Sequence, residues 1–185
     1  MKDLINNSIQ NHSKTLQLID KNMINSASNV ILAAINEGKT IFWCGNGGSA
    51  SQANHLSAEL IGGMYQKKIK PFKSICLNVD TAFITAWSND DSFDNVFVRQ
   101  LEALSESGDI LIGLSTSGNS SNVVKAAQFA HSNKLKVISL TGNDGGILNK
   151  HSDININIPT NVTQRIQEMH ILIGHILCDI IESSS

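Results

Sequence analysis

Short apolar runs alternate with helical segments along most of the chain, and this alternation limits the possible folds more than any other feature. Runs typical of buried strands lie at 40–45, 74–78, 108–115 and 134–142, and the alternating run at 154–159 is expected as an edge strand. The segments between these runs, and the segment after the last, have the apolar spacing of helices. The pattern therefore predicts an α/β fold in which helices cover both faces of a central parallel sheet of about five strands.

Length and composition predict one ordinary globular domain. The 185 residues include no linker-like stretch and no repeat, and the formal net charge of -2 argues against a nucleic-acid surface. No apolar stretch approaches the length of a membrane span, and the N-terminus lacks the apolar core of a signal peptide. The three cysteines are far apart and have no CxxC spacing, as expected for reduced thiols. We therefore expect a cytoplasmic protein that binds neither nucleic acid nor a membrane.

Two loops that follow predicted strands are rich in glycine and serine, and each precedes a predicted helix. They are GNGGSAS at 45–51 and STSGNSS at 115–121. Glycine lets the backbone approach a ligand closely, and serine hydroxyls and helix N-terminal amides donate hydrogen bonds to an anion. Ligands of parallel sheets bind beyond the carboxyl ends of the strands, so two such loops at one edge favour a phosphate site. The same residues could instead be caps and turn formers, with Ser49 or Ser51 as a helix N-cap.

A dinucleotide site is less favoured than the phosphate of a small metabolite. The first loop lacks the third glycine of the G-x-G-x-x-G fingerprint, and it also lacks the lysine of a P-loop.

Histidines and a carboxylate on two predicted helices are candidates for chemistry. His55 and Glu59 are four residues apart, so they lie on one helix face, either as an exposed pair or as ligands of one metal ion. Gln167, His170 and His175 interrupt an otherwise apolar C-terminal helix, where a buried polar group needs a partner. His170 is interpreted as a core histidine or a functional one with equal weight, whereas the position of His175 favours a functional role.

Several of these motifs occur together in one known family. CGNGGSAS, NHLSAEL, SND, STSGNS, TGNDGG and RIQEMHILIGHILCDIIE resemble the sugar isomerase (SIS) domain family, and within it the phosphoheptose isomerases. The similarity covers nearly the whole chain from about residue 40 onward. The resemblance implies that residues 1–185 form a single SIS domain with a three-layer flavodoxin-like fold. It further implies a homotetramer with active sites between subunits, in which the helical segment 1–37 packs.

The resemblance also implies an activity. Members convert D-sedoheptulose 7-phosphate into D-glycero-D-manno-heptose 7-phosphate through an enediol, as the first step of bacterial heptose biosynthesis for lipopolysaccharide or capsule. Such a reaction moves a proton between adjacent carbons and therefore needs a base and an acid.

The residue roles that the resemblance implies fall on both Gly-Ser loops and both histidine-bearing helices. The substrate contacts would be Asn46, Gly47, Gly48, Glu59, Asn89, Asp90, Ser115, Thr116, Ser117, Ser120 and Gln167. Glu59 and His175 would be the acid–base pair. The ligands of one zinc ion per subunit would be His55, Glu59, Gln167 and His175. Because a straight helix separates Gln167 from His175 by roughly 12 Å, one ion could accept both only with a long reach, a bent helix or different subunits.

One departure from the family and two alternative functions remain open. Gly63 stands where many members have an arginine, and Lys67 or Lys68 could replace that anion-binding group. One alternative is a non-catalytic SIS protein that binds a replication initiator; such relatives lack the acid–base pair that this chain has. The other is an isomerase of a different phosphosugar, such as a hexose 6-phosphate.

Overall fold

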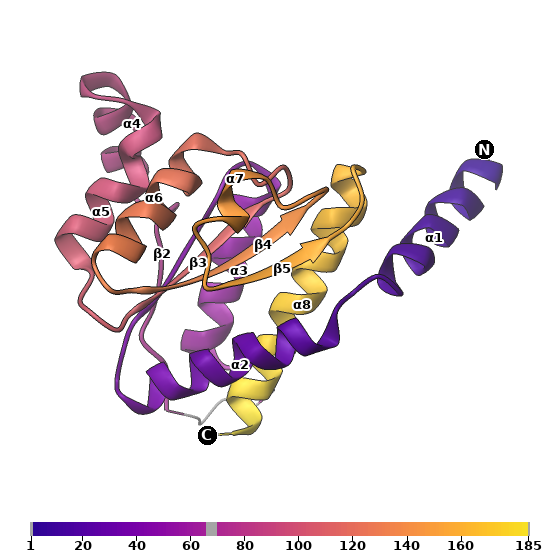
Figure 1. Cartoon of the computed structure of the whole chain (residues 1–185), viewed down its shortest axis with the longest axis horizontal. Helices are drawn as coiled ribbons and strands as arrows, with labels where there is room; N and C mark the ends of the chain where they lie inside the picture. Colours follow the sequence, from indigo (N-terminus) through magenta and orange to yellow (C-terminus); the bar gives the residue numbers. More distant parts are fainter. Residues whose placement is uncertain (1, 66–69, 185) are drawn as a thin grey trace.

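The computed structural model describes residues 2–65 and 70–184. Within these ranges five strands form one sheet in the order β2-β1-β3-β4-β5, and all neighbouring strands are parallel (Figure 1). The strands are β1 (Ile41–Gly45), β2 (Ser74–Cys76), β3 (Ile110–Ser115), β4 (Lys136–Gly142) and β5 (Ile154–Ile158). The α/β fold and the parallel sheet expected from the sequence are confirmed, and β5 is an edge strand.

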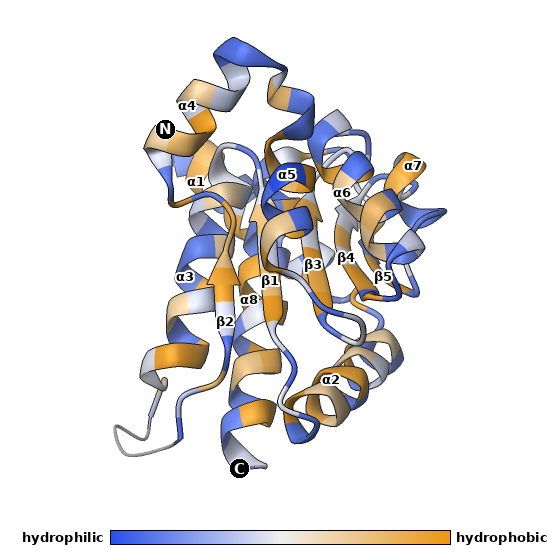
Figure 2. Cartoon of the chain, turned by 90° about the vertical axis from the view of Figure 1, so that its left-hand side faces the viewer, coloured by the Kyte–Doolittle hydropathy of each residue, from blue (hydrophilic) through white to orange (hydrophobic). Residues whose placement is uncertain are grey.

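Helices cover both faces of this sheet and make it the middle of three layers. The helices are α1 (Lys2–Leu16), α2 (Lys21–Asn36), α3 (Gly48–Gly62), α4 (Thr81–Asp90), η1 (Phe93–Asn95), α5 (Val96–Leu104), α6 (Ser121–Ser132), α7 (Gly146–Asn149) and α8 (Thr163–Ser183). One core lies between the sheet and α2, α3 and α8, and the other lies between the sheet and α5, α6 and α7. Successive strand residues point to opposite faces, so Trp43 enters the first core and Phe42 the second. The hydrophobic colour of the strands in Figure 2 follows from this double burial.

The start of α3 differs from the sequence prediction. The N-cap is Gly47, with φ +56° and ψ -123°, rather than Ser49 or Ser51. A positive φ at this tight turn after β1 suits glycine, which has no Cβ to clash with the backbone. Ser49 instead lies buried in the first turn of the helix. A second difference is that α4 continues through Asp90, so 88–90 is helical and the turn that follows is shorter than expected.

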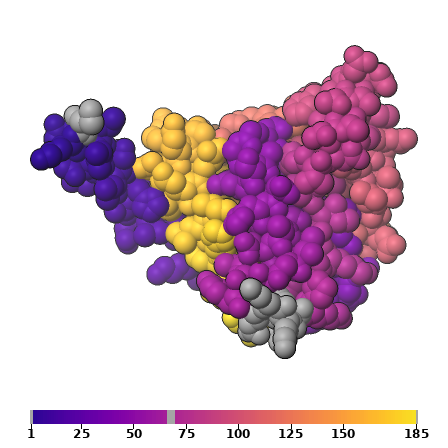
Figure 3. Space-filling model, turned by 180° about the vertical axis from the view of Figure 1, so that it is seen from behind, coloured from indigo at the N-terminus to yellow at the C-terminus, as the bar shows by residue number. Residues whose placement is uncertain are grey.

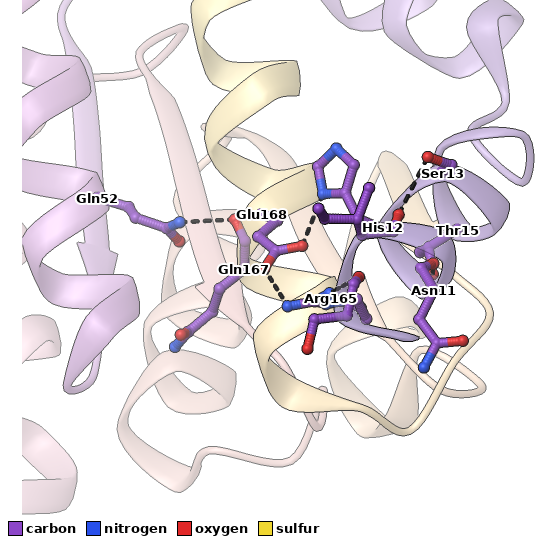
Figure 4. Close-up of polar contacts among 10 residues, drawn as sticks. Asn11, His12, Ser13, Thr15, Gln52, Arg165, Gln167 and Glu168 are labelled. Carbon is purple, nitrogen blue, oxygen red and sulfur yellow. Dashed lines mark hydrogen bonds and ion pairs between the residues drawn. The ribbon is translucent and has the colours of Figure 1, made fainter. Parts of the chain in front are cut away.

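The N-terminal helix α1 stands away from the body of the molecule (Figures 1 and 3). Its apolar residues Leu4, Ile5 and Ile9 are 71%, 56% and 60% exposed. Polar contacts join α1 to the start of α8: His12 Nδ1 lies 2.7 Å from Glu168 Oε2 (Figure 4), and Arg165 donates to the backbone oxygen of Ser8. The break expected once within residues 1–37 falls between α1 and α2.

Two further sequence predictions concern the cysteines and membrane-spanning helices. Cys44, Cys76 and Cys178 are buried free thiols, and burial raises the pKa of each. No helix among the described residues is both long and apolar enough to cross a membrane.

Candidate active site at the sheet edge and the α3–α8 seam

The two Gly-Ser loops meet at the carboxyl edge of the sheet. One follows β1 and the other follows β3, which are neighbours in the sheet although β2 lies between them in sequence. In parallel sheets a ligand crevice opens where the connections diverge in this way. The loops touch directly, because Asn46 Nδ2 donates to Asn122 Oδ1 at 2.8 Å and Asn122 Nδ2 donates to Asn46 Oδ1 at 2.9 Å.

The loop after β3 presents serine hydroxyls at the start of α6. Ser115 Oγ and Ser120 Oγ lie 2.9 Å apart, so one hydroxyl donates to the other and one proton remains for a ligand. Ser117 Oγ accepts a hydrogen bond from the Asn119 N–H at 3.1 Å, which leaves its own proton free to donate. Thr116 lies in the same turn. The hydroxyls and the first amides of a 12-residue helix together suit an anion.

The TGNDGG loop after β4 supports the serine loop. The Leu148 N–H donates to Gly118 O at 2.8 Å, and the Ile147 N–H donates to Asn119 Oδ1 at 3.0 Å. A Cβ on Gly118, whose φ is +66°, would lie 2.0 Å from Gly145 O. The backbones of the two loops are therefore packed against each other, and the third loop fixes the shape of the second.

Helices α3 and α8 run side by side from this edge and form a seam (Figure 3). At the loop end, a Cβ on Gly48 would lie 2.6 Å from Gln167 Nε2, so the missing side chain makes room for Gln167. Gln52 Nε2 donates to the backbone oxygen of Gln167 at 2.7 Å (Figure 4). Further along, Cys178 Sγ lies 3.9 Å from Leu56 O. Gln167 is thus placed beside the loops, as a substrate-binding role requires.

Three of the four predicted zinc ligands meet further along the seam. His55 Nε2 lies 2.9 Å from His175 Nε2 and 3.5 Å from Glu59 Oε1. The two rings are edge-to-face at 85°, so one imidazole N–H donates to the other. The side chains of His55 and Glu59 are 47% and 24% exposed, which leaves the group open to a ligand. A carboxylate and two imidazoles in one place can transfer protons or bind a metal ion.

The donor types of this group fit zinc, but their spacing is that of a hydrogen-bonded pair. Two nitrogens on one tetrahedral zinc would be about 3.3 Å apart, somewhat more than the 2.9 Å observed. As placed, the described His, Cys, Asp and Glu side chains form no group of three that could hold a metal ion. Gln167 lies eight residues before His175 on α8, so a rise of about 12 Å along the helix separates their backbones.

His170 is a core histidine. It is 0% exposed, its Nε2 lies 3.0 Å from Thr141 O, and its Nδ1 has no hydrogen-bond partner. Burial lowers its pKa to about 4, and the bond to the Thr141 carbonyl opposes this shift only in part. The neutral ring with a proton on Nε2 satisfies this geometry, which supports the structural interpretation of His170.

The remaining predicted residues lie apart from the seam or outside the described ranges. Asn89 and Asp90 end α4, which has no buried residue, and Asn89 Nδ2 donates to Asp90 Oδ1 at 2.9 Å. No hydrogen bond in the described part of the chain joins either residue to the serine loop. Gly63 ends α3 with φ +81°, and Lys67 and Lys68 lie outside the described residues.

Three residues of the site were not predicted from the sequence. Asn119 and Asn122 belong to the STSGNSSN stretch, so their position in a ligand loop was visible, but their partners across the sheet edge were not. Gln52 had no local signal except its place on the helix face shared by Gly48 and His55.

Comparisons of sequence relate the chain to a known family and to proteins of similar length. Residues 6–142 match the family model described as the SIS domain. A phosphoheptose isomerase from Helicobacter hepaticus is 48% identical over 185 residues, with 99% of this chain and 94% of the relative covered. One from Aliarcobacter butzleri is 44% identical, with 99% and 98% covered.

Solved structures agree with these relatives. The phosphoheptose isomerase from Neisseria gonorrhoeae has a TM-score of 0.92 at 37% identity, with 98% of each chain covered. The phosphoheptose isomerase from Francisella tularensis has a TM-score of 0.91 at 34% identity, with 98% and 96% covered.

Proposed function

Because this chain belongs to the SIS domain family and groups with its phosphoheptose isomerases, we propose that it converts D-sedoheptulose 7-phosphate into D-glycero-D-manno-heptose 7-phosphate. The observation that supports this most is the grouping of His55, Glu59 and His175 on the seam that starts at the anion-binding loops. The product would supply bacterial heptose for lipopolysaccharide or capsule.

The two parts of the site match the two ends of an open-chain sugar phosphate. The phosphate would bind between the loops, to the hydroxyls of Ser115, Thr116, Ser117 and Ser120 and to amides of Gly47 and Gly48. From Gly48 to His55 is seven residues along α3, or about 10 Å. An extended seven-carbon chain with a terminal phosphate spans such a distance and would bring its carbonyl end to the histidines. Asn46 and Gln167 would line the path near the phosphate.

The chemistry follows from the groups at the far end. The carboxylate of Glu59 would remove the proton from C1 of the ketose while an acid, His175, protonates the oxygen on C2. The resulting enediol would lose its O1 proton to the imidazole and receive a proton at C2 from Glu59, which gives the aldose and restores both groups. His55, within hydrogen-bond distance of His175, would orient that ring. If the two imidazole nitrogens moved a few tenths of an ångström apart, His55, Glu59 and His175 would have the donor types to hold zinc, which would polarise the carbonyl.

The exposed parts of the chain favour a homo-oligomer, which we propose is a homotetramer. The apolar residues Leu4, Ile5 and Ile9 of α1 are exposed to solvent in the single chain. Helix α4 has no buried residue, although it bears Asn89 and Asp90. A neighbouring subunit would cover α1 and bring Asn89 or Asp90 to a site that one chain leaves open.

The test is turnover of sedoheptulose 7-phosphate by the purified protein. Glu59→Gln and His175→Gln should each abolish turnover while their circular dichroism spectra match the wild type. Glu102→Gln is the matched control, because Glu102 is exposed on α5 and its one ion pair among the described residues is with Arg99. Wild-type turnover of a hexose 6-phosphate but not of the heptulose would change the substrate assignment. No turnover of either, with or without zinc, would refute the proposed activity.

A further inference from the structure

The paired amides of Asn46 and Asn122 are an unusual feature of the sheet edge. The two side chains form two reciprocal hydrogen bonds, of 2.8 Å and 2.9 Å. Asn122 is only 2% exposed, and its Oδ1 also accepts from the Val123 N–H at 3.0 Å. Both polar atoms of the Asn122 amide therefore have a partner inside the protein, and burial keeps the second N–H of Nδ2 from a ligand.

The loops 45–48 and 115–121 together form what we call the phosphate cradle. The Asn46–Asn122 pair joins its two halves. Asn46 precedes Gly47, the N-cap of α3, and Asn122 is the second residue of α6. The N-terminal ends of two helices bear partial positive charge and repel each other until an anion lies between them. A buried bidentate contact that spans them would hold both ends at the separation that the anion needs.

We propose that Asn122 is a positioning residue that locks the two halves of the phosphate cradle through Asn46. The inference rests on the proposed function, because it assumes that the cradle binds the phosphate of the substrate. Asn122 itself touches no substrate. It keeps the two loops ordered before the phosphate binds, so that binding loses less conformational entropy. Its loss would leave both polar ends of the Asn46 side chain without their present partners and would let the loops separate.

This role gives a specific kinetic signature. Asn122→Ala should raise the KM for the phosphosugar about tenfold and weaken inhibition by inorganic phosphate by the same factor. The kcat should stay within about threefold, because the acid–base group lies at least seven residues further along α3. Asn133→Ala is the matched control at the opposite end of the same helix, where Asn133 Nδ2 donates to Phe129 O. It should leave both constants unchanged.

A double-mutant cycle separates a lock from two independent contacts. The affinity of inorganic phosphate is measured by calorimetry for the wild type, Asn46→Ala, Asn122→Ala and the double variant. If the pair acts as one unit, the double variant should bind phosphate about as well as either single variant. Effects that multiply would overturn the proposal, and so would wild-type phosphate affinity in Asn122→Ala or a fall in kcat alone. Should Asn122→Ala not fold, Asn122→Ser takes its place in the same measurements, because the shorter side chain stays polar but cannot make both bonds to Asn46.

The phosphate measurement also distinguishes this proposal from the proposed reaction. Phosphate binding that depends on Asn122 in a protein without isomerase activity would support the lock and refute the reaction. An active wild type whose phosphate affinity does not depend on Asn122 would refute the lock alone. A wild type that binds no phosphate would refute the lock, and one that also fails to turn over the sugar phosphate would refute both.

Discussion

The buried ring of His170 predicts an acid-sensitive stability that can be calculated from the structure. Burial lowers its pKa from 6.5 to about 4 in the folded protein. Below pH 6.5 the unfolded chain binds a proton at this residue that the folded protein does not bind. Stability from this group is therefore complete above about pH 6.5 and is lost as the pH falls toward 4. The expected loss between pH 7.5 and pH 5 is about 2 kcal/mol, with a limit near 3 kcal/mol at lower pH.

The matched variant is His170→Gln, which has no titratable group there. The Gln side chain can still donate to Thr141 O, so the helix–strand contact at the end of β4 is kept. Urea unfolding, followed by far-UV circular dichroism at one protein concentration, gives the free energy of unfolding at each pH. The difference between wild type and variant should shrink by about 2 kcal/mol from pH 7.5 to pH 5. Parallel curves would show that His170 titrates equally in both states and would refute the reasoning.

Three further changes test other contacts. Gly118→Ala should lower the free energy of unfolding by more than about 2 kcal/mol, because the new Cβ would strike Gly145 O in a residue with φ +66°; an unchanged melting temperature would contradict the loop packing. Gly48→Ala should leave thermal stability nearly unchanged but raise the KM several-fold, because its Cβ would displace the side chain of Gln167; an unchanged KM would remove Gln167 from the site. Replacing Leu4, Ile5 and Ile9 of α1 by serine should convert the expected tetramer to smaller species in light scattering; an unaltered mass would place the interface elsewhere.

The centre of the sheet was predictable because β1, β3 and β4 are buried on both faces and therefore read as nearly continuous apolar runs. Strands β1, β3 and β4 all lie within the expected segments. The boundaries that were missed depend on backbone geometry that a sequence does not display. Gly47 became the N-cap because the turn after β1 needs a positive φ, whereas propensity alone favours a nearby serine.

The residue types of the site and one of its groupings were predictable. The four-residue spacing of His55 and Glu59 placed them on one helix face, and the family resemblance grouped them with His175, which lies 120 residues after His55 and is 2.9 Å from it in the structure. The contact between Asn122 and Asn46 was not predictable, because no local pattern indicates it. The position of Gln167 relative to His175 follows from helix rise, so the sequence already showed that a straight helix separates them.

The central claim is that Glu59 moves a carbon-bound proton of a sugar held by the loops. The most direct measurement is the incorporation of deuterium from heavy water into sedoheptulose 7-phosphate and its aldose product, followed by proton NMR. The wild type should introduce deuterium at the carbon next to the carbonyl, and Glu59→Gln should introduce none while Glu102→Gln behaves as the wild type. Equal deuterium incorporation by Glu59→Gln and the wild type would show that another group abstracts the proton and would contradict the account.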